Sequence, residues 1–160
     1  MAITLLRVDD RLVHGQVVEG WLPSLKADII LVVSEAAAAD PVSSALMKMA
    51  MPPAVGLLVL GVAAAAEALA SPQMAARRVL VLVPGPAEAL ALLRKGVAVD
   101  RVNVGGLHFT IGKVQLGRAL FLDEKDKDAL REIAKRGVRL EGRPLPSDPE
   151  EDLAPMLRSA

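Results

Sequence analysis

The sequence predicts an α/β domain: an open, mainly parallel β-sheet with helices on both faces and a small antiparallel part near the C-terminus. Short runs of Val, Ile and Leu alternate with longer stretches rich in Ala and Leu, the pattern of repeated strand–helix–strand units. Several of the short runs are apolar at every position, which is typical of parallel strands buried on both faces. We expect a single domain over residues 1–160, since domains commonly contain roughly 100–200 residues.

The strands of the parallel sheet are predicted at the short apolar runs. The sequence Ile-Ile-Leu-Val-Val follows Asp28, and Val-Leu-Val-Leu-Val occupies residues 79–83. Pro84, Gly85 and Pro86 end the second of these runs, because proline and glycine interrupt a ladder of hydrogen bonds. Strands are predicted over residues 3–8, 28–33, 55–60, 79–83 and 102–104.

The stretches between these strands predict helices. Asp40 followed by Pro41 is typical of an N-cap and the first helical residue. Gly96 after Arg94 and Lys95 is typical of a helix end. Helices are predicted over residues 15–25, 40–51, 63–70 and 87–95.

The last third of the chain predicts a different organisation. Residues 113–122 predict two short strands bent at Gly117, which supply the small antiparallel part. A charged helix capped by Asp123 is predicted over residues 124–136, and residues 138–143 predict an edge strand. A last short helix is predicted to begin at Asp148-Pro149, with acidic residues in its first turn.

Composition excludes several function classes. The chain has 19 Lys and Arg against 19 Asp and Glu, so it lacks the excess of basic residues typical of duplex-binding proteins. One Trp and two Phe are few for stacking on single-stranded bases. No cysteine is present, which excludes disulfides, thiol catalysis and Cys-ligated zinc and is typical of a cytoplasmic protein. We expect no partner nucleic acid.

Two apolar segments do not predict membrane insertion or export. The apolar start of the chain is followed at once by Arg7 and Asp9, unlike a signal peptide, whose charges precede a longer apolar stretch. Residues 49–66 carry no charge, but Pro52, Pro53 and Gly56 leave an uninterrupted apolar part too short to span a bilayer.

The densest group of reactive side chains follows the first predicted strand. Asp9, Asp10, Arg11 and His14 lie within six residues, where a strand leads into a helix, and parallel sheets bind ligands at the carboxyl ends of their strands. An imidazole can accept and release a phosphoryl group, Arg11 is suited to phosphate oxygens, and a helix N-terminus favours anions. Either aspartate can orient Arg11 or His14. The alternative is a structural histidine beside a solvated turn.

A second group follows the fifth predicted strand. Gly105 and Gly106 permit close approach of the backbone to a ligand, or simply a tight turn. His108 is the only other histidine, and it is either a loop residue or a supporting part of the site. The P-loop, the dinucleotide-binding glycine pattern, the His-Glu-x-x-His zinc motif and the Gly-x-Ser-x-Gly elbow are all missing. We therefore expect no metal and no dinucleotide.

Residues 7–17 read Arg-Val-Asp-Asp-Arg-Leu-Val-His-Gly-Gln-Val. This block closely resembles the IIB component of the mannose/fructose/sorbose class of the bacterial sugar phosphotransferase system, differing from the family pattern only at Val13, where Ile is usual. The resemblance continues through residues 30–34, 51–53, 101–109 and 122–126. Departures from the family pattern include Glu35, where Asp is common, and Leu107, where Met is common.

The resemblance implies a function and a set of site residues. Such proteins accept a phosphoryl group from the IIA component and pass it to a sugar entering through the membrane components IIC and IID. They act as protein-Nπ-phosphohistidine–sugar phosphotransferases in the cytoplasm, at the periphery of the membrane complex. His14 would carry the group on Nδ1, Arg11 would contact its oxygens, and Asp9 would orient Arg11. The rim would comprise Asp10, Gly15, Gln16, Ser34, Gly105, Gly106 and His108.

No cofactor is expected beyond the transient phosphoryl group. Two alternatives use the same residues: a regulatory phosphoprotein without sugar transport, and a binding module for small anions with no covalent step. The sequence does not indicate the sugar. It shows no exposed apolar stripe that would indicate an oligomer.

Overall fold

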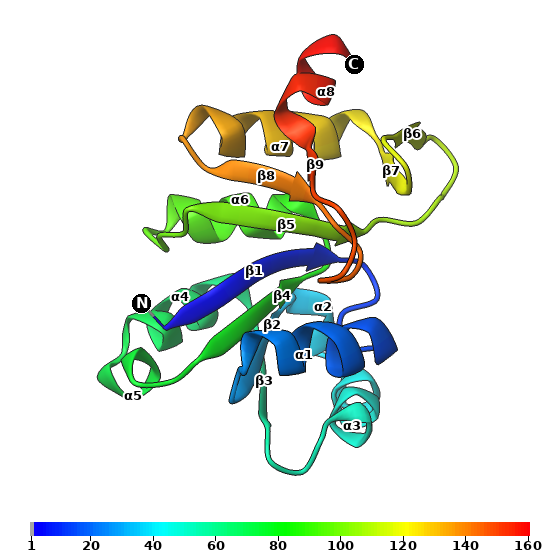
Figure 1. Cartoon of the computed structure of the whole chain (residues 1–160). Coiled ribbons are helices and arrows are strands. Elements are labelled where there is room, and N and C mark those ends of the chain that lie inside the picture. Colours follow the sequence, from blue (N-terminus) through cyan, green and yellow to red (C-terminus); the bar gives the residue numbers. More distant parts are fainter. Residues whose placement is uncertain (1) are drawn as a thin grey trace.

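The computed structural model describes residues 2–160 and contains one seven-stranded sheet surrounded by helices (Figure 1). The strand order is β3-β2-β4-β1-β5-β8-β9. Neighbouring strands are parallel except β8 and β9, which are antiparallel. The strands are β1 (Ile3–Asp9), β2 (Ile29–Val33), β3 (Gly56–Leu60), β4 (Val79–Val83), β5 (Arg101–Gly106), β8 (Arg139–Gly142) and β9 (Glu151–Asp152). A separate antiparallel pair contains β6 (Val114–Leu116) and β7 (Leu120–Leu122).

Helices connect the strands. A π-helix, η1, follows β1, and π-helical turns are often found at functional sites. The helices are η1 (Gln16–Trp21), α1 (Leu22–Leu25), α2 (Glu35–Ala38), α3 (Pro41–Ala50), α4 (Val62–Ala70), α5 (Pro72–Ala75), α6 (Pro86–Arg94), α7 (Glu124–Lys135) and α8 (Leu153–Ser159). No helix within residues 2–160 combines the length and apolar character needed to span a membrane.

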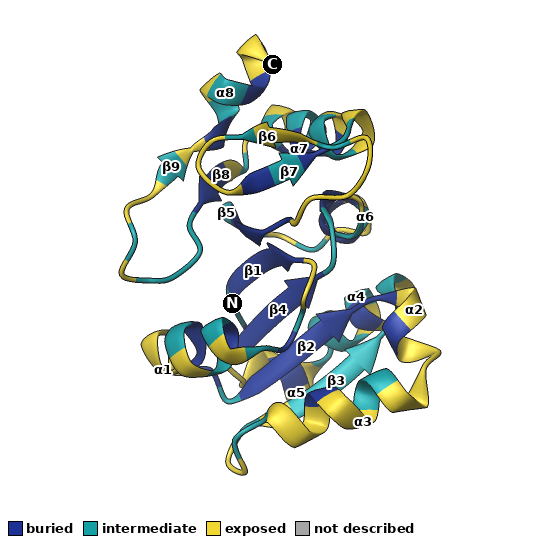
Figure 2. Ribbon diagram, turned by 90° about the vertical axis from the view of Figure 1, so that its right-hand side faces the viewer, coloured by how far each residue is buried: buried dark blue, intermediate teal, exposed yellow. Residues whose placement is uncertain are grey.

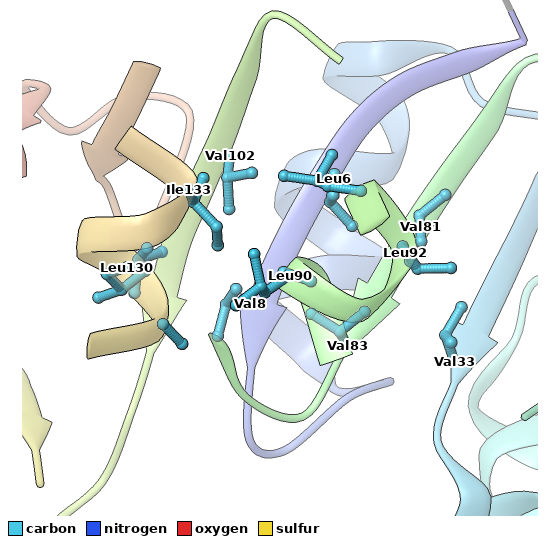
Figure 3. Close-up of a cluster of buried hydrophobic side chains, with 14 of the residues drawn as sticks. Leu6, Val8, Val33, Val81, Val83, Leu90, Leu92, Val102, Leu130 and Ile133 are labelled. Atoms are coloured by element: carbon cyan, nitrogen blue, oxygen red, sulfur yellow. The ribbon is translucent and has the colours of Figure 1, made fainter. Parts of the chain in front are cut away.

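The sheet separates two hydrophobic cores. Successive residues of a strand point to opposite faces, so Ile30 and Val32 pack with η1, α1 and α3, whereas Leu31 and Val33 pack with the core under α4 and α6. Figure 3 shows the second core, in which Leu6 and Val8 of β1 meet α6 and α7. The strands β2 and β4 are buried along their whole length (Figure 2). Burial on both faces explains their uniformly apolar sequences.

The predicted fold class is confirmed, and most predicted elements are present within a few residues. Two short helices, α2 and α5, were not predicted. Each is a single turn capped by a serine side chain, Ser34 and Ser71 respectively, and a four-residue helix gives no periodic apolar pattern. Pro72 at the start of α5 separates it from α4.

The prediction for the C-terminal segment is wrong in two respects. The last helix begins at Leu153 rather than Asp148, with Asp152 as its cap and no acidic residue in its first turn. Asp148 instead accepts a hydrogen bond from the backbone of Leu145 inside a loop. In addition, β8 is not the edge of the sheet, because β9 pairs outside it.

The expectation of no exposed apolar stripe is also wrong. Val42, Leu46 and Met49 lie on one face of α3 and are 67, 62 and 82% exposed. The spacing of three and four residues that creates this stripe was present in the sequence. The buried face of α3 contains Met47.

Two loops meet at the carboxyl edge of the sheet. The strands β1 and β5 are neighbours, and Asp9 at the end of β1 pairs with Gly106 at the end of β5. The backbone N–H of Asp10 then donates to the carbonyl of Gly106 over 2.9 Å. The register therefore brings the two reactive groups of the sequence side by side.

Candidate active site

The site is centred on a direct contact between His14 and Asp9. Nε2 of His14 lies 2.7 Å from Oδ2 of Asp9. The histidine side chain is 16% exposed, whereas the aspartate side chain is fully buried. A carboxylate only accepts hydrogen bonds, so this contact assigns a proton to Nε2, and in the neutral ring the lone pair then lies on Nδ1.

The carboxylate of Asp9 has partners on both oxygens. Oδ2 also accepts from Nη2 of Arg7 over 3.0 Å, and Oδ1 accepts from the backbone N–H of Arg11 over 3.0 Å. Burial alone would raise the pKa of Asp9, but the hydrogen bond to His14 and the charge of Arg7 outweigh it and hold the pKa below its ordinary value. Asp9 is therefore ionised in the folded protein at neutral pH.

Arg11 lies at the solvent side of the same carboxylate. Its Nε is 3.5 Å from Oδ1 of Asp9, and its side chain is 39% exposed. Its Nη2 donates to the side-chain oxygen of Gln16 over 3.0 Å. The guanidinium is thus held near His14 while remaining open to an incoming anion.

The turn between Arg11 and His14 is tight. Leu12 has φ of +58°, in the left-handed region that costs non-glycine residues energy. Its N–H donates to the carbonyl of Asp9 over 3.0 Å. The η1 helix starts immediately after Gly15, which itself has helical φ and ψ. This turn brings Arg11 and His14 to the two oxygens of one carboxylate, Arg11 to Oδ1 and His14 to Oδ2 of Asp9.

Arg7 is a residue beneath the site that the sequence analysis did not single out. Its side chain is fully buried, although it lies in the middle of β1. Nη1 donates to Oδ1 of Asn103 over 2.7 Å, and Asn103 donates to Oε1 of the buried Glu141 over 3.2 Å. A charged residue inside an otherwise apolar strand was the available signal, but its partners on β5 and β8 depend on a register that the sequence does not show.

The glycine pair serves Arg7 and Asp9. Gly105 and Gly106 lie inside β5 and neither has a positive φ, so the alternative interpretation of the pair as a tight turn is wrong. A Cβ on Gly105 would lie 1.9 Å from Cζ of Arg7, and one on Gly106 would lie 3.0 Å from Oδ1 of Asp9. Glycine at these positions leaves room for the buried guanidinium and carboxylate.

Asp10 holds the second histidine. Its Oδ1 lies 2.6 Å from Nδ1 of His108, and its Oδ2 accepts from the backbone N–H of His108 over 2.7 Å. The side chain of His108 is 56% exposed. The two neighbouring aspartates thus bind the two histidines of the chain by opposite ring nitrogens.

Ser34 lies beside the site and is largely buried. It is 6% exposed, and its Oγ accepts from the backbone N–H of Ala37 over 3.1 Å, which caps α2. Among residues 2–160, no group of three or more acidic or histidine side chains is close enough to share a metal ion.

Two shallow hollows flank the turn that carries His14. One, of about 450 Å³, lies between the turn residues Arg11, Leu12 and Val13 and the opposite wall, which contains Ser34 and residues of α2 and α3. The other, of about 480 Å³, lies between Gly15, Gln16 and Glu19 and the loop 145–147. The site is therefore approached over an open surface, which suits a macromolecular partner better than a small enclosed substrate.

Comparisons with known proteins identify the family of the chain. The profile of the family described as "PTS system sorbose subfamily IIB component" matches residues 3–160. The chain belongs to this family. It is 37% identical over 153 residues to the sorbose-specific EIIB component of Lacticaseibacillus casei, covering 96% of this chain and 93% of that protein.

Other members of the family support the same placement. The IIB component resembles the crystal structure of the IIBSor domain of the Klebsiella pneumoniae sorbose permease, with a TM-score of 0.94, 34% identity, and coverage of 100% of this chain and 98% of that one. It is 39% identical over 150 residues to the mannose-specific EIIAB component of Escherichia coli strain K12, covering 94% of this chain. The IIB component spans 46% of the length of that relative. The predicted family is confirmed.

Proposed function

We propose that this IIB component carries a phosphoryl group on Nδ1 of His14. It takes the group from a phosphohistidine of a IIA component and passes it to a sugar that enters through IIC and IID. The observation that carries the proposal is the 2.7 Å contact between Nε2 of His14 and Asp9. Because that contact occupies Nε2, the nucleophilic lone pair lies on Nδ1.

Acceptance of the phosphoryl group by His14 balances without a separate acid or base. The Nδ1 lone pair of neutral His14 attacks phosphorus in line, and the bond from phosphorus to the donor nitrogen breaks with its electron pair returning to the donor ring. The phosphorylated His14 ring keeps its Nε2 proton and becomes cationic. Asp9, which accepts a hydrogen bond from that proton, stabilises the cation directly. Transfer to a sugar hydroxyl reverses these steps at His14, with the hydroxyl proton leaving to solvent or a partner group.

Arg11 is placed to stabilise the oxygens of the moving group. Phosphoryl transfer depends mainly on positioning and charge stabilisation. The guanidinium of Arg11 is fixed by Asp9 and Gln16 but 39% exposed. It therefore offers donors to a phosphoryl group without being reorganised during transfer.

The partners and location follow from this chemistry. The E. coli relative is named for both an A and a B component, which supports a IIA protein as donor. Onward transfer to an entering sugar requires the IIB component to sit in the cytoplasm at the periphery of the membrane complex. The relatives are named for mannose and sorbose at similar identities of 39 and 37%, so overall similarity does not single out a sugar. We propose no cofactor besides the transient phosphoryl group.

The decisive experiment mixes the chain with phosphorylated IIA and measures its intact mass. Wild type is expected to gain one acid-labile phosphoryl group, and His14→Ala is expected to gain none. His108→Ala is the matched control, because it removes the other histidine and is expected to retain the adduct. An adduct that persists in His14→Ala overturns the proposal.

A wild-type chain that stays unmodified by an active donor also overturns it. In that case, phosphate binding that survives His14→Ala supports the anion-binding module instead. Two-dimensional NMR of the phosphorylated chain tests the nitrogen: a coupling of phosphorus to Nε2 rather than Nδ1 contradicts the assignment.

A further inference from the structure

We propose that Arg7 is a positioning residue for phosphoryl transfer. It holds Asp9 against His14 and balances the charge of Asp9, so that the carboxylate fixes the ring without converting it into an unreactive imidazolium. This inference rests on the proposed function of His14. It concerns a residue that touches neither the phosphoryl group nor a partner.

Arg7 and His14 both contact the same carboxylate oxygen, Oδ2 of Asp9. Nη2 of Arg7 and Nε2 of His14 lie 3.0 and 2.7 Å from Oδ2 of Asp9. The side chains of Arg7 and Asp9 are both fully buried, so water screens the pair little. A change in the charge or position of Arg7 therefore acts directly on Oδ2 of Asp9, the atom that contacts the ring of His14.

Arg7 is fixed from behind by groups that hold it in one place. Nη1 donates to Asn103 and to the carbonyl of Arg143, and Nη2 also donates to the carbonyl of Pro144 over 3.0 Å. Its guanidinium lies 5.2 Å from the ring centre of Trp21, within the range of a cation–π contact. These contacts are more than are needed to neutralise one aspartate. They also fix the orientation of the Arg7 guanidinium toward Asp9.

The charge balance between Arg7 and Asp9 affects both unmodified and phosphorylated His14. A buried carboxylate whose only cationic partner is an imidazole strongly favours the protonated ring, which has no lone pair on Nδ1. The charge of Arg7 weakens that preference and keeps neutral His14 available as an acceptor. The same charge limits how strongly Asp9 stabilises the phosphorylated ring, and so keeps the phosphoryl group transferable.

The other charged groups around Arg7 and Asp9 provide a control variant for the test. Arg11 faces Asp9 from the solvent side, and Asp10 pairs with His108 on the adjoining loop. Beyond Asn103, Glu141 pairs with Arg101 at 3.0 Å. Arg101 therefore belongs to the same hydrogen-bonded chain as Arg7 but does not contact Asp9.

The test compares Arg7→Gln, Arg7→Lys and Arg101→Gln with wild type. For each full-length variant, the rate of phosphoryl acceptance from phosphorylated IIA is measured from pH 5 to 9. Nitrogen NMR of the histidine rings reports, without any donor, which ring atoms of His14 carry protons. Thermal unfolding and the fluorescence of Trp21 monitor the fold.

We expect Arg7→Gln to move the acidic limb of the pH–rate profile to higher pH and to lower the rate at pH 7 about ten-fold, an effect of about 1.4 kcal/mol. Its NMR spectrum should show doubly protonated His14 at a pH where wild type shows the Nε2-protonated form. Arg7→Lys restores the charge and should restore part of both effects. Arg101→Gln should leave the profile at the wild-type position. A rate lowered equally at every pH in both Arg7 variants, or a profile shift of equal size in Arg101→Gln, overturns the proposal.

A second variant covers the failure of Arg7→Gln to fold. The double variant Asn103→Asp/Glu141→Gln exchanges donor and acceptor between these two side chains, because Asn103 donates to Oε1 of Glu141 over 3.2 Å in wild type. It places a new carboxylate beside Nη1 of Arg7, and we expect a shift in the same direction. No shift in that folded variant overturns the inference. If wild type accepts no phosphoryl group, the proposed function fails, while the protonation of His14 still decides whether Arg7 controls the ring.

Discussion

The guanidinium of Arg7 lies directly against the Cα atom of Gly105, so that a Cβ there would lie 1.9 Å from Cζ. Neither the strand β5 nor Arg7 can move aside easily, because Arg7 is fully buried and has four hydrogen-bond acceptors around it. The position of the Arg7 side chain, which orients Asp9, therefore depends on the absence of a side chain at Gly105 on the neighbouring strand.

Gly105→Ala should destabilise the fold by about 3–5 kcal/mol, because it displaces a buried cation from its partners. Urea unfolding measures the loss. Gly15→Ala is the control, since a Cβ there meets no atom within 4 Å and its φ is −52°. Equal stability of Gly105→Ala and wild type would show that Arg7 can be accommodated elsewhere.

Asp9→Asn should reduce phosphoryl acceptance by roughly 10²-fold, the usual scale for losing a group that sets a catalytic protonation state. An amide has no charge to stabilise the phosphorylated ring, and its NH₂ group would face a donor at either position: Arg7 and His14 at Oδ2, or the backbone N–H of Arg11 at Oδ1. Rapid-quench measurements with phosphorylated IIA test this. Asp10→Asn is the matched control at the adjacent position, and a larger loss there would reverse the roles assigned to the two aspartates.

The acid stability of the protein should depend on Asp9. Its pKa is below the ordinary value, so between the two values the unfolded state binds more protons and stability rises with pH. The contribution is complete above about pH 4 and is lost as the pH falls through the folded value. Urea unfolding between pH 2.5 and 7 should show a steeper acid decline in wild type than in Asp9→Asn. Parallel curves would contradict this, because the exposed caps Asp40 and Asp123, whose pKa values are also lowered, are present in both proteins.

Glu88→Gln should stabilise the protein at neutral pH by about 0.5 kcal/mol. Burial and the nearby charge of Asp126 raise the pKa of Glu88 above its ordinary value, so the unfolded state releases its proton first and stability falls as the pH rises. The gain from glutamine should vanish below about pH 4, where both states are protonated. Glu67→Gln on α4 serves as the control. A gain that is the same at pH 4 and pH 7 would exclude ionisation as its cause.

The sequence predicted the parts of the fold that follow from local pattern. The all-apolar runs at β2 and β4 identified buried parallel strands, and Asp40-Pro41 located the start of α3. The short helices α2 and α5 were missed because a single turn has no period to detect. The last helix was misplaced because Asp148-Pro149 carries the same signals as a helix start, whereas β9 is fixed only by its pairing with β8.

The sequence was sufficient to predict which residues of the site lie close together, but not how they are oriented. Asp9, Arg11 and His14 lie within one turn of chain after a strand, so their meeting required no knowledge of the fold. The orientation of the histidine ring and the role of the glycine pair required the register between β1 and β5. Arg7 was invisible as a site residue for the same reason, since Asn103 and Glu141 are 96 and 134 positions away, and only strand pairing brings Asn103 to Arg7 and Glu141 to Asn103.

The polar chain from Arg7 through Asn103 to Glu141 crosses three adjacent strands beneath the site. Its members constrain one another: the guanidinium requires the amide, the amide orientation requires the carboxylate, and the space for the guanidinium requires glycine at position 105. Evolution can therefore alter these four positions only as a set. Among related proteins, those without arginine at the position of Arg7 should also tolerate residues other than glycine at the position of Gly105. Grafting the His14 turn into another scaffold should fail unless all four residues are transferred with it.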